Sequence, residues 1–125
     1  MKVLSGVDLV EIGRVEAAIQ RHGGRLLGRV FTAGEVDLCQ GRAESLAARF
    51  AAKEAVAKAL GCGIGQVAWR DVEVLHDDNR APRLLLHGEA ARLAGRMGAV
   101  DWSISLSHEK HYAIAFVVAL CTGCE

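Results

Sequence analysis

Residues 43–60 read AESLAARFAAKEAVAKAL, and this stretch decides the fold of the chain. It contains neither proline nor glycine, and most of it is alanine, leucine, glutamate, lysine or arginine, the residues that favour helices. Gly61 follows at the position where a glycine commonly ends a helix. The sequence therefore predicts one long helix over residues 43–60.

Shorter helices are predicted on both sides of this stretch. Residues 14–22 favour a helix that is ended by the two glycines after it. Thr32 and Glu35 match a capping box, in which each side chain accepts a hydrogen bond from the backbone N–H of the other, so a short helix is expected to begin at Thr32. A further helix is predicted over residues 89–97.

Strand patterns occupy the start of the chain and most of its second half. The segments with apolar strand-like patterns are residues 2–10, 72–75, 83–86, 102–107 and 112–120. Residues 77–80 are expected to form the turn of a hairpin, and residues 109–111 join the last two strands. Helices grouped mainly in the first half and strands in the second predict an α+β domain with an antiparallel sheet.

Composition limits both the architecture and the class of partner. The chain has 125 residues, of which 51% are hydrophobic and only 5% aromatic, so we expect a single domain with an aliphatic, alanine-rich core. This apolar content excludes disorder as the main state. The 15 basic residues are balanced by 15 acidic ones, which argues against a protein held on nucleic acid by bulk positive charge.

The sequence gives no sign of a membrane segment. The longest apolar run, residues 112–121, is about half as long as a membrane-spanning helix requires, and no basic-then-apolar signal peptide opens the chain. We therefore expect a soluble, cytoplasmic protein with no membrane partner. Of the four cysteines only Cys121 and Cys124 are close together, without the second pair that a zinc site needs. Both are expected to be reduced thiols near a frayed terminus, and a redox or metal role for this tail is the alternative.

Three charged residues suggest chemistry. Asp8 interrupts an apolar strand, where an unpaired carboxylate is costly to bury, although it could also be solvated at the strand end or paired with Arg14. Glu54 and Lys58 are four residues apart on one face of the predicted helix, among small alanines that would let a large group approach. The alternative for this pair is an ordinary surface ion pair worth about 0.2–0.5 kcal/mol.

Two further segments have weaker signals. Gly61, Gly63 and Gly65 would let backbone amides approach a phosphate or a base, although the same glycines also suit a helix stop and a turn. Ser105 and Ser107 would point the same way from a strand that ends in a histidine, which is itself more often a surface residue than a ligand.

Arginine is concentrated near the start of the chain. Glu16 is the only acid between residues 13 and 34, a segment that holds Arg14, Arg21, Arg25 and Arg29. Arginine suits bidentate pairing with carboxylate or phosphate, so this local positive charge suggests an acidic partner. A solvated helix face is the alternative.

Taken in order, these motifs resemble the holo-acyl-carrier-protein synthases, the small trimeric branch of the 4′-phosphopantetheinyl transferases. The matching segments are residues 6–12 with Arg14, residues 31–32 with Glu35, residues 49–55, residues 58–61, and residues 105–108 with Tyr112 and Ala113. Each motif alone is weak, and their order and spacing make the match specific. The resemblance implies the family's fold, an antiparallel sheet packed against a long central helix, in one domain over residues 1–125.

The resemblance also implies a reaction, the Mg²⁺-dependent transfer of 4′-phosphopantetheine from coenzyme A to a serine of apo-acyl carrier protein, which releases adenosine 3′,5′-bisphosphate. Asp8 and Glu54 would hold Mg²⁺ against the pyrophosphate, and Lys58 would stabilise the departing bisphosphate. Glu54, directly or through water, is the candidate base for the serine proton.

Binding roles are implied for further residues. The expected coenzyme A contacts are Arg49, Lys58, Gly61, Gly63, Gly65, Pro82, Ser107 and His108, with Arg49 at the 3′-phosphate. The carrier protein is acidic, which fits Arg14, Arg21, Arg25 and Arg29 as its docking face. A homotrimer with sites built between neighbouring subunits is expected.

The sequence departs from the family pattern in two places, and three competing functions are considered. Residues 79–82 read Asn-Arg-Ala-Pro where the family often has Asn-Gly-Lys-Pro, and this loss of glycine is expected to change the turn and with it any coenzyme contact near Pro82. Residues 121–125 are not part of the resemblance. A Mg²⁺-dependent hydrolase could cut the same pyrophosphate with water. A catalytically silent module could bind coenzyme A or an acidic protein, with Glu54 and Lys58 as a mere ion pair. RNA binding is poorly supported, because no aromatic platform accompanies the arginines.

Overall fold

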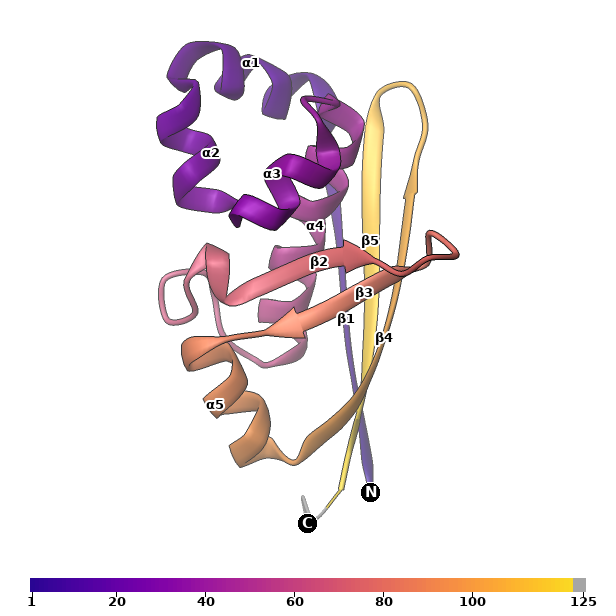
Figure 1. The fold of residues 1–125 in the computed structure, drawn as a ribbon. Coiled ribbons are helices and arrows are strands. Elements are labelled where there is room, and N and C mark those ends of the chain that lie inside the picture. Colours follow the sequence, from indigo (N-terminus) through magenta and orange to yellow (C-terminus); the bar gives the residue numbers. More distant parts are fainter. Residues whose placement is uncertain (123–125) are drawn as a thin grey trace.

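Helix α4 (Ala43–Ala59) lies between two antiparallel sheets in the computed structural model, which describes residues 1–122 (Figure 1). The other elements are β1 (Lys2–Glu11), α1 (Ile12–His22), α2 (Gly24–Val30), α3 (Ala33–Cys39), the 3₁₀ turn η1 (Trp69–Asp71), β2 (Val72–His76), β3 (Pro82–Leu86), α5 (Gly88–Met97), β4 (Ala99–His108) and β5 (Tyr112–Cys121). This arrangement confirms the α+β fold with an antiparallel sheet against a long central helix.

The main core lies on both sides of α4. One sheet has the strand order β1-β5-β4, and the other is the β2-β3 hairpin. Fully buried alanines of α4 contact Val72 and Val74 of β2 and also Ala115 and Val117 of β5. Because alanine side chains are short, both sheets can approach the helix closely, which explains a core with few aromatic residues.

The opposite face of the three-stranded sheet is apolar and exposed. The large hydrophobic residues that are at least 38% exposed on these strands are Val3, Val7, Leu9, Val100, Tyr112, Ile114 and Phe116. Along β5 they alternate with Ala113, Ala115 and Val117, which are fully buried against the helices. Within residues 1–122 the chain therefore leaves one side of this sheet uncovered.

Most of the predicted elements are confirmed. The long helix begins at Ala43 as expected, and Gly61, with φ of 73°, follows its end. The Thr32 hydroxyl accepts a hydrogen bond from the Glu35 amide at 3.2 Å, and the Glu35 carboxylate accepts one from the Thr32 amide at 3.0 Å, so the capping box is present. The strands lie within one residue of their predicted bounds, except that β4 begins three residues early, at Ala99.

Helix α2 (Gly24–Val30) was not predicted, because the two glycines were interpreted only as a stop. Gly23 ends α1 with φ of 56° and redirects the chain, after which Gly24 begins a second helix. That helix buries Val30 in a cluster with Phe31, against which Leu26 and Leu27 also pack. Tertiary packing of these side chains therefore outweighs the low helix propensity of the glycines.

Cys121 is a free cysteine, as expected, but the expectation that it lies near a frayed end is wrong. Its side chain is fully buried at the end of β5, where the residue pairs with Lys2 of β1 and Ala99 of β4. Cys124 lies outside the described residues. None of the helices within residues 1–122 is long and apolar enough to cross a membrane.

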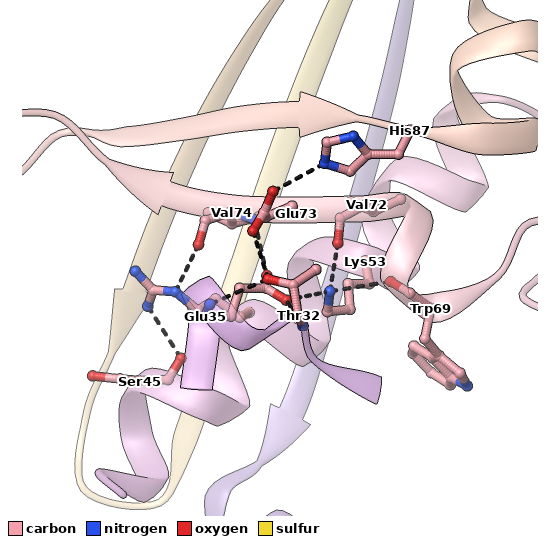
Figure 2. A network of polar contacts seen from close by, with 10 residues as sticks. Thr32, Glu35, Ser45, Lys53, Trp69, Val72, Glu73, Val74 and His87 are labelled. Atoms are coloured by element: carbon pink, nitrogen blue, oxygen red, sulfur yellow. Dashed lines mark hydrogen bonds and ion pairs between the residues drawn. The ribbon is translucent and has the colours of Figure 1, made fainter. Parts of the chain in front are cut away.

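A buried ion pair fastens α4 to α3 and to the hairpin (Figure 2). Lys53 and Glu35 are both fully buried, and the Lys53 ammonium donates to the Glu35 carboxylate at 2.8 Å. The same ammonium donates to the carbonyls of Trp69 and Val72, while the second Glu35 oxygen accepts the Val74 amide at 2.8 Å. Burial lowers the pKa of Lys53, and the charge of Glu35 opposes that shift.

Removing one partner of this pair should therefore be costly. We expect Lys53→Met to lower the free energy of unfolding by about 3–5 kcal/mol, because the Glu35 carboxylate stays buried without its cation. The measurement is urea unfolding at fixed protein concentration, with the exposed Lys110→Met as control. Adding Glu35→Gln to Lys53→Met should recover part of the loss, because the buried charge is gone. A loss below about 1 kcal/mol in Lys53→Met would show that the pair is not a major constraint.

Candidate functional site

Asp8 lies on the face of β1 that is turned toward α4. Gly6 and Asp8 share that face because successive side chains of a strand alternate, whereas Val7 and Leu9 point outward and are 48% and 60% exposed. The Asp8 carboxylate is only 20% exposed. The carboxylate that interrupts the apolar strand is therefore set against the central helix.

Gly6 lets the backbone of β1 pack directly against the backbone of α4. A Cβ atom built on Gly6 would lie 1.9 Å from the carbonyl oxygen of Ala55 and 3.1 Å from the amide nitrogen of Ala59. Only glycine fits here, since the obstructing atoms belong to the helix backbone and not to a flexible side chain. This contact places the next residue on the same face, Asp8, beside the part of α4 that carries Glu54 and Lys58.

Lys58 reaches across to β1. Its ammonium donates to the Asp8 carboxylate at 3.1 Å and to the Val7 carbonyl at 2.9 Å, with 54% of the side chain still exposed. Within residues 1–122 the ion pairs do not include one between Glu54 and Lys58, nor one between Asp8 and Arg14, whose guanidinium lies 4.0 Å from Glu11 instead. Both simple ion-pair alternatives considered for these residues are therefore wrong.

Glu54 lies close enough to Asp8 for their charges to interact. Partial burial raises the pKa of the Glu54 carboxyl, the negative charge of Asp8 raises it further, and the Lys58 ammonium opposes both effects. The structure therefore brings together two carboxylates and one ammonium, contributed by β1 and α4. This is the group of three residues that the sequence singled out.

The two carboxylates face a cavity of about 710 Å³. Its other walls come mainly from apolar side chains of α1 and α2, with Phe31 and Phe50, and Arg14 also lines it. An apolar surrounding strengthens electrostatic interactions with any charged group bound at the acids. The cavity thus joins the two acids to the arginine-rich segment.

The donor set fits a hard cation that retains other ligands. No group of three or more His, Cys, Asp or Glu in residues 1–122 is placed to enclose a metal, so a cation held by Asp8 and Glu54 would keep other ligands as well. Mg²⁺ is commonly bound in this way, by one or two carboxylates together with water and substrate phosphates. A divalent cation would also relieve the repulsion that contributes to the raised pKa of Glu54.

The remaining residues predicted to contact coenzyme A lie in other places on the single chain. Arg49 and Pro82 line a separate cavity of about 220 Å³, and His108 lines a third of about 380 Å³ at the end of β4. Ser107 is exposed on β4 and, like Ser105, points away from the helices. Gly61, Gly63 and Gly65 follow the far end of α4, with open space where a side chain would be.

The predicted arginine face is exposed. Arg14 and Arg21 lie on α1, and Arg25 and Arg29 lie on α2, all with accessible side chains. Arg14 also lines the cavity that contains Asp8 and Glu54. Positive charge is therefore placed directly beside the two carboxylates.

Sequence reasoning missed two features of this site. Gly6 was interpreted as part of a motif and not as the point of contact between strand and helix. The available signal was a glycine on an apolar strand, two residues before a carboxylate. Glu35 was assigned only a capping role, although it also neutralises Lys53, the residue immediately before Glu54. A lysine between buried alanines of α4 was the available hint.

Comparison with protein families gives one match across most of the chain. Residues 5–117 match the model of the 4′-phosphopantetheinyl transferase superfamily. A protein of Herpetosiphon aurantiacus named holo-[acyl-carrier-protein] synthase is 50% identical over 125 residues, which cover 94% of this chain and 98% of that protein. Sequence similarity thus extends over nearly the whole domain.

Solved structures show the same fold. The holo-[acyl-carrier-protein] synthase of Helicobacter pylori in complex with coenzyme A matches with a TM-score of 0.86 and 32% identity, over 94% of this chain and 100% of that one. The enzyme of that name from Bacillus anthracis, in complex with CoA (3′,5′-ADP), matches with a TM-score of 0.78 and 31% identity, over 95% and 96% of the two chains.

The role of Gly6 can be tested by adding one methyl group. Gly6→Ala should lower the free energy of unfolding by about 1–3 kcal/mol, because β1 must move away from the Ala55 carbonyl. The control is Gly95→Ala in α5, where an added Cβ meets nothing within 4 Å and should be neutral or stabilise by up to about 1 kcal/mol. Urea unfolding measures both, and equal stabilities of the two variants would contradict the proposed contact.

Proposed function

The chain belongs to the 4′-phosphopantetheinyl transferase superfamily, and from this premise we propose that it transfers 4′-phosphopantetheine from coenzyme A to a serine of apo-acyl carrier protein. The observation that carries the proposal is the group formed by Asp8, Glu54 and Lys58. Two carboxylates for a cation and one ammonium for phosphate are the groups that cleavage of a phosphoanhydride requires. Relatives named holo-[acyl-carrier-protein] synthase, and their complexes with coenzyme A, support the choice of substrates.

In the proposed reaction the serine oxygen attacks the phosphorus that bears the pantetheine. The bond from this phosphorus to the bridging oxygen breaks, and adenosine 3′,5′-bisphosphate leaves with the electron pair. Glu54, directly or through water, accepts the serine proton. Lys58, oriented by Asp8 and the Val7 carbonyl, places its ammonium beside the leaving phosphate.

We propose Mg²⁺ as the cation of this site, held by Asp8 and Glu54. When bound, Mg²⁺ supplies positive charge for the phosphate oxygens. Asp8 contributes a carboxylate already fixed by its bond to Lys58, and the apolar cavity next to it limits competition from water.

We propose that the coenzyme A contacts are shared between neighbouring chains. Arg49 and Pro82, His108, and the glycines after α4 keep their predicted roles, but they do not share a cavity with Asp8 and Glu54 in a single chain. A neighbouring chain that contributes one set of these residues would complete the site. This separation supports the homotrimer with shared sites that the family resemblance implied.

The uncovered sheet face is the surface we propose for this assembly. Monomeric proteins rarely expose large apolar patches, and this one includes Leu9, Tyr112 and Phe116. Leu9 and Tyr112 also line the cavity of the two carboxylates. Copies that pack against this face therefore border the site directly.

Trimer formation through this face can be tested with one charge. We expect sedimentation to show a trimer for the unmodified chain and smaller species for Phe116→Asp, because a carboxylate cannot be buried there without a partner. Transfer activity should fall with the loss of trimer. The control is Ala91→Asp on the exposed side of α5. A chain that is monomeric and fully active would contradict the proposed assembly.

The arginines of α1 and α2 are proposed to bind the acidic carrier protein. They are exposed, and Arg14 adjoins the cavity in which the serine must react. Electrostatic attraction of this kind speeds encounter and fixes orientation. A cytoplasmic location, where both substrates would be available, remains part of the proposal.

Charge reversal should weaken the capture of the carrier protein. Arg25→Glu is expected to raise the KM for carrier protein about tenfold at low salt, and the difference should shrink as salt screens the charges. Steady-state kinetics at two ionic strengths measures this effect, with Arg96→Glu on α5 as the matched reversal elsewhere. An unchanged KM in Arg25→Glu would exclude this face.

The reaction itself is tested by mass spectrometry of apo-acyl carrier protein incubated with the chain, coenzyme A and Mg²⁺. A mass gain equal to phosphopantetheine is expected, and Asp8→Asn or Glu54→Gln should slow it at least about 100-fold, equivalent to about 2.7 kcal/mol of barrier. Asp37→Asn, an exposed acid of α3, is the control. Free phosphopantetheine with unmodified carrier protein would indicate the hydrolase instead, and full activity of Glu54→Gln would remove the site assignment.

A further inference from the structure

A groove of about 500 Å³ lies between α2, α3 and η1, and the proposed reaction makes no use of it. Its large apolar lining residues are Leu27, Phe31 and Val36. Gly24 and Gly28 also line it, one turn apart on α2, and a Cβ atom on either residue would meet nothing within 4 Å. Because these two residues have no side chains, the groove is open on the α2 side.

Helix α2 contributes to the walls of both this groove and the cavity of the two carboxylates. Leu26 lines the cavity, whereas the next two residues, Leu27 and Gly28, line the groove. Phe31 is only 2% exposed and borders both hollows. The groove is therefore separated from the candidate active site by little more than one short helix and one aromatic side chain.

Unpaired arginines lie on two of the elements that form the groove. Arg70 of η1 is exposed and lines the groove, while Arg25 and Arg29 are exposed on α2. Within residues 1–122, no carboxylate lies within 4.0 Å of these three guanidinium groups. Asp37 is the only acid among the described residues that line the groove. An apolar surface with a surplus of positive charge favours a partner that presents apolar and acidic side chains together.

The η1 side of the groove is fastened to the helix that carries Glu54. The Trp69 carbonyl of η1 accepts a hydrogen bond from the buried Lys53 ammonium at 3.1 Å (Figure 2), and the Trp69 ring stacks on Phe50 with 4.7 Å between the ring centroids. Lys53 and Phe50 both belong to α4, and Phe50 also lines the cavity of the two carboxylates. A partner seated against η1 is therefore held in a defined position relative to Glu54.

We propose that this groove seats an apolar side chain of the carrier protein and that Arg70 pairs with an acid beside that side chain. The inference rests on the proposed function, which makes an acidic carrier protein the partner and assigns Arg25 and Arg29 to it. The groove and Arg70 add a second point of attachment, outside the cavity in which the serine reacts. Because pairs between flexible arginines and acids tolerate many orientations, the seated apolar side chain is the anchor that fixes one of them.

Filling the groove tests the proposal. Gly28→Leu should raise the KM for carrier protein about tenfold, as expected for the loss of one buried apolar side chain, with kcat and the KM for coenzyme A unchanged. Gly28→Ala adds one methyl group and should stay within about threefold. Gly95→Leu is the control, because Gly95 of α5 also has open space around it. Leucine favours helices more than glycine does, so neither leucine variant should lower the melting temperature.

Salt dependence separates the two parts of the attachment. Arg70→Glu should raise the KM for carrier protein up to about fivefold at low salt, and this difference should shrink as salt screens the charges. The difference caused by Gly28→Leu should persist, because an apolar contact is not screened. Arg96→Glu on α5 is the matched control for the charge reversal. A KM for carrier protein that neither Gly28→Leu nor Arg70→Glu changes would overturn the proposal.

Calorimetry with apo-acyl carrier protein, without coenzyme A, distinguishes failure of this inference from failure of the proposed function. Gly28→Leu should weaken binding about tenfold, and this result would support the groove even if the chain did not modify carrier protein. If carrier protein is modified and Gly28→Leu binds it as tightly as the unmodified chain, the inference is wrong and the proposed function stands. Loss of trimer in Gly28→Leu, measured by sedimentation without carrier protein, would show that the groove holds a second copy of this chain and would also overturn the proposal.

Discussion

The backbone of β1 touches the backbone of α4 at Gly6, and the candidate active site depends on this contact. With Ala55 and Ala59 opposite, neither element carries a side chain that would separate them. Asp8 therefore reaches the flank of the helix on which Glu54 and Lys58 lie. A carboxylate in an apolar strand is tolerated there because the Lys58 ammonium donates to it at 3.1 Å.

The other side of α4 is held by a buried ion pair. Lys53 enters the interior and binds Glu35 and two carbonyls, which ties the helix to α3 and the hairpin (Figure 2). Burial of this pair is a weak source of net stability, but it permits few other arrangements of the three elements. Along α4, Arg49 donates to Val74 of the hairpin, Lys53 enters the buried pair, and Lys58 donates to Asp8 of β1. Alanine between the charged residues makes room for all three.

Local sequence patterns predicted those structural features that depend only on residues close together in the chain. Helix propensity gave α4, and the capping box at Thr32 needed only residues three positions apart. Helix α2 and the burial of Cys121 were missed because they depend on packing partners from distant segments. The ion pair between Lys58 and Asp8, 50 residues apart, likewise depends on the contact between strand and helix. No local sequence pattern predicts it. Motif order led to the proposed site residues, whereas how they lie relative to one another could be learned only from the fold.

The proposed reaction depends on β1 and α4 together holding a single divalent ion. A crystal structure of the assembled protein with coenzyme A and Mg²⁺ tests it most directly. We expect one ion with octahedral coordination, at about 2.0–2.1 Å from an oxygen of Asp8 and an oxygen of Glu54, the remaining ligands being phosphate and water. Coenzyme A bound with its metal away from both carboxylates would contradict the account.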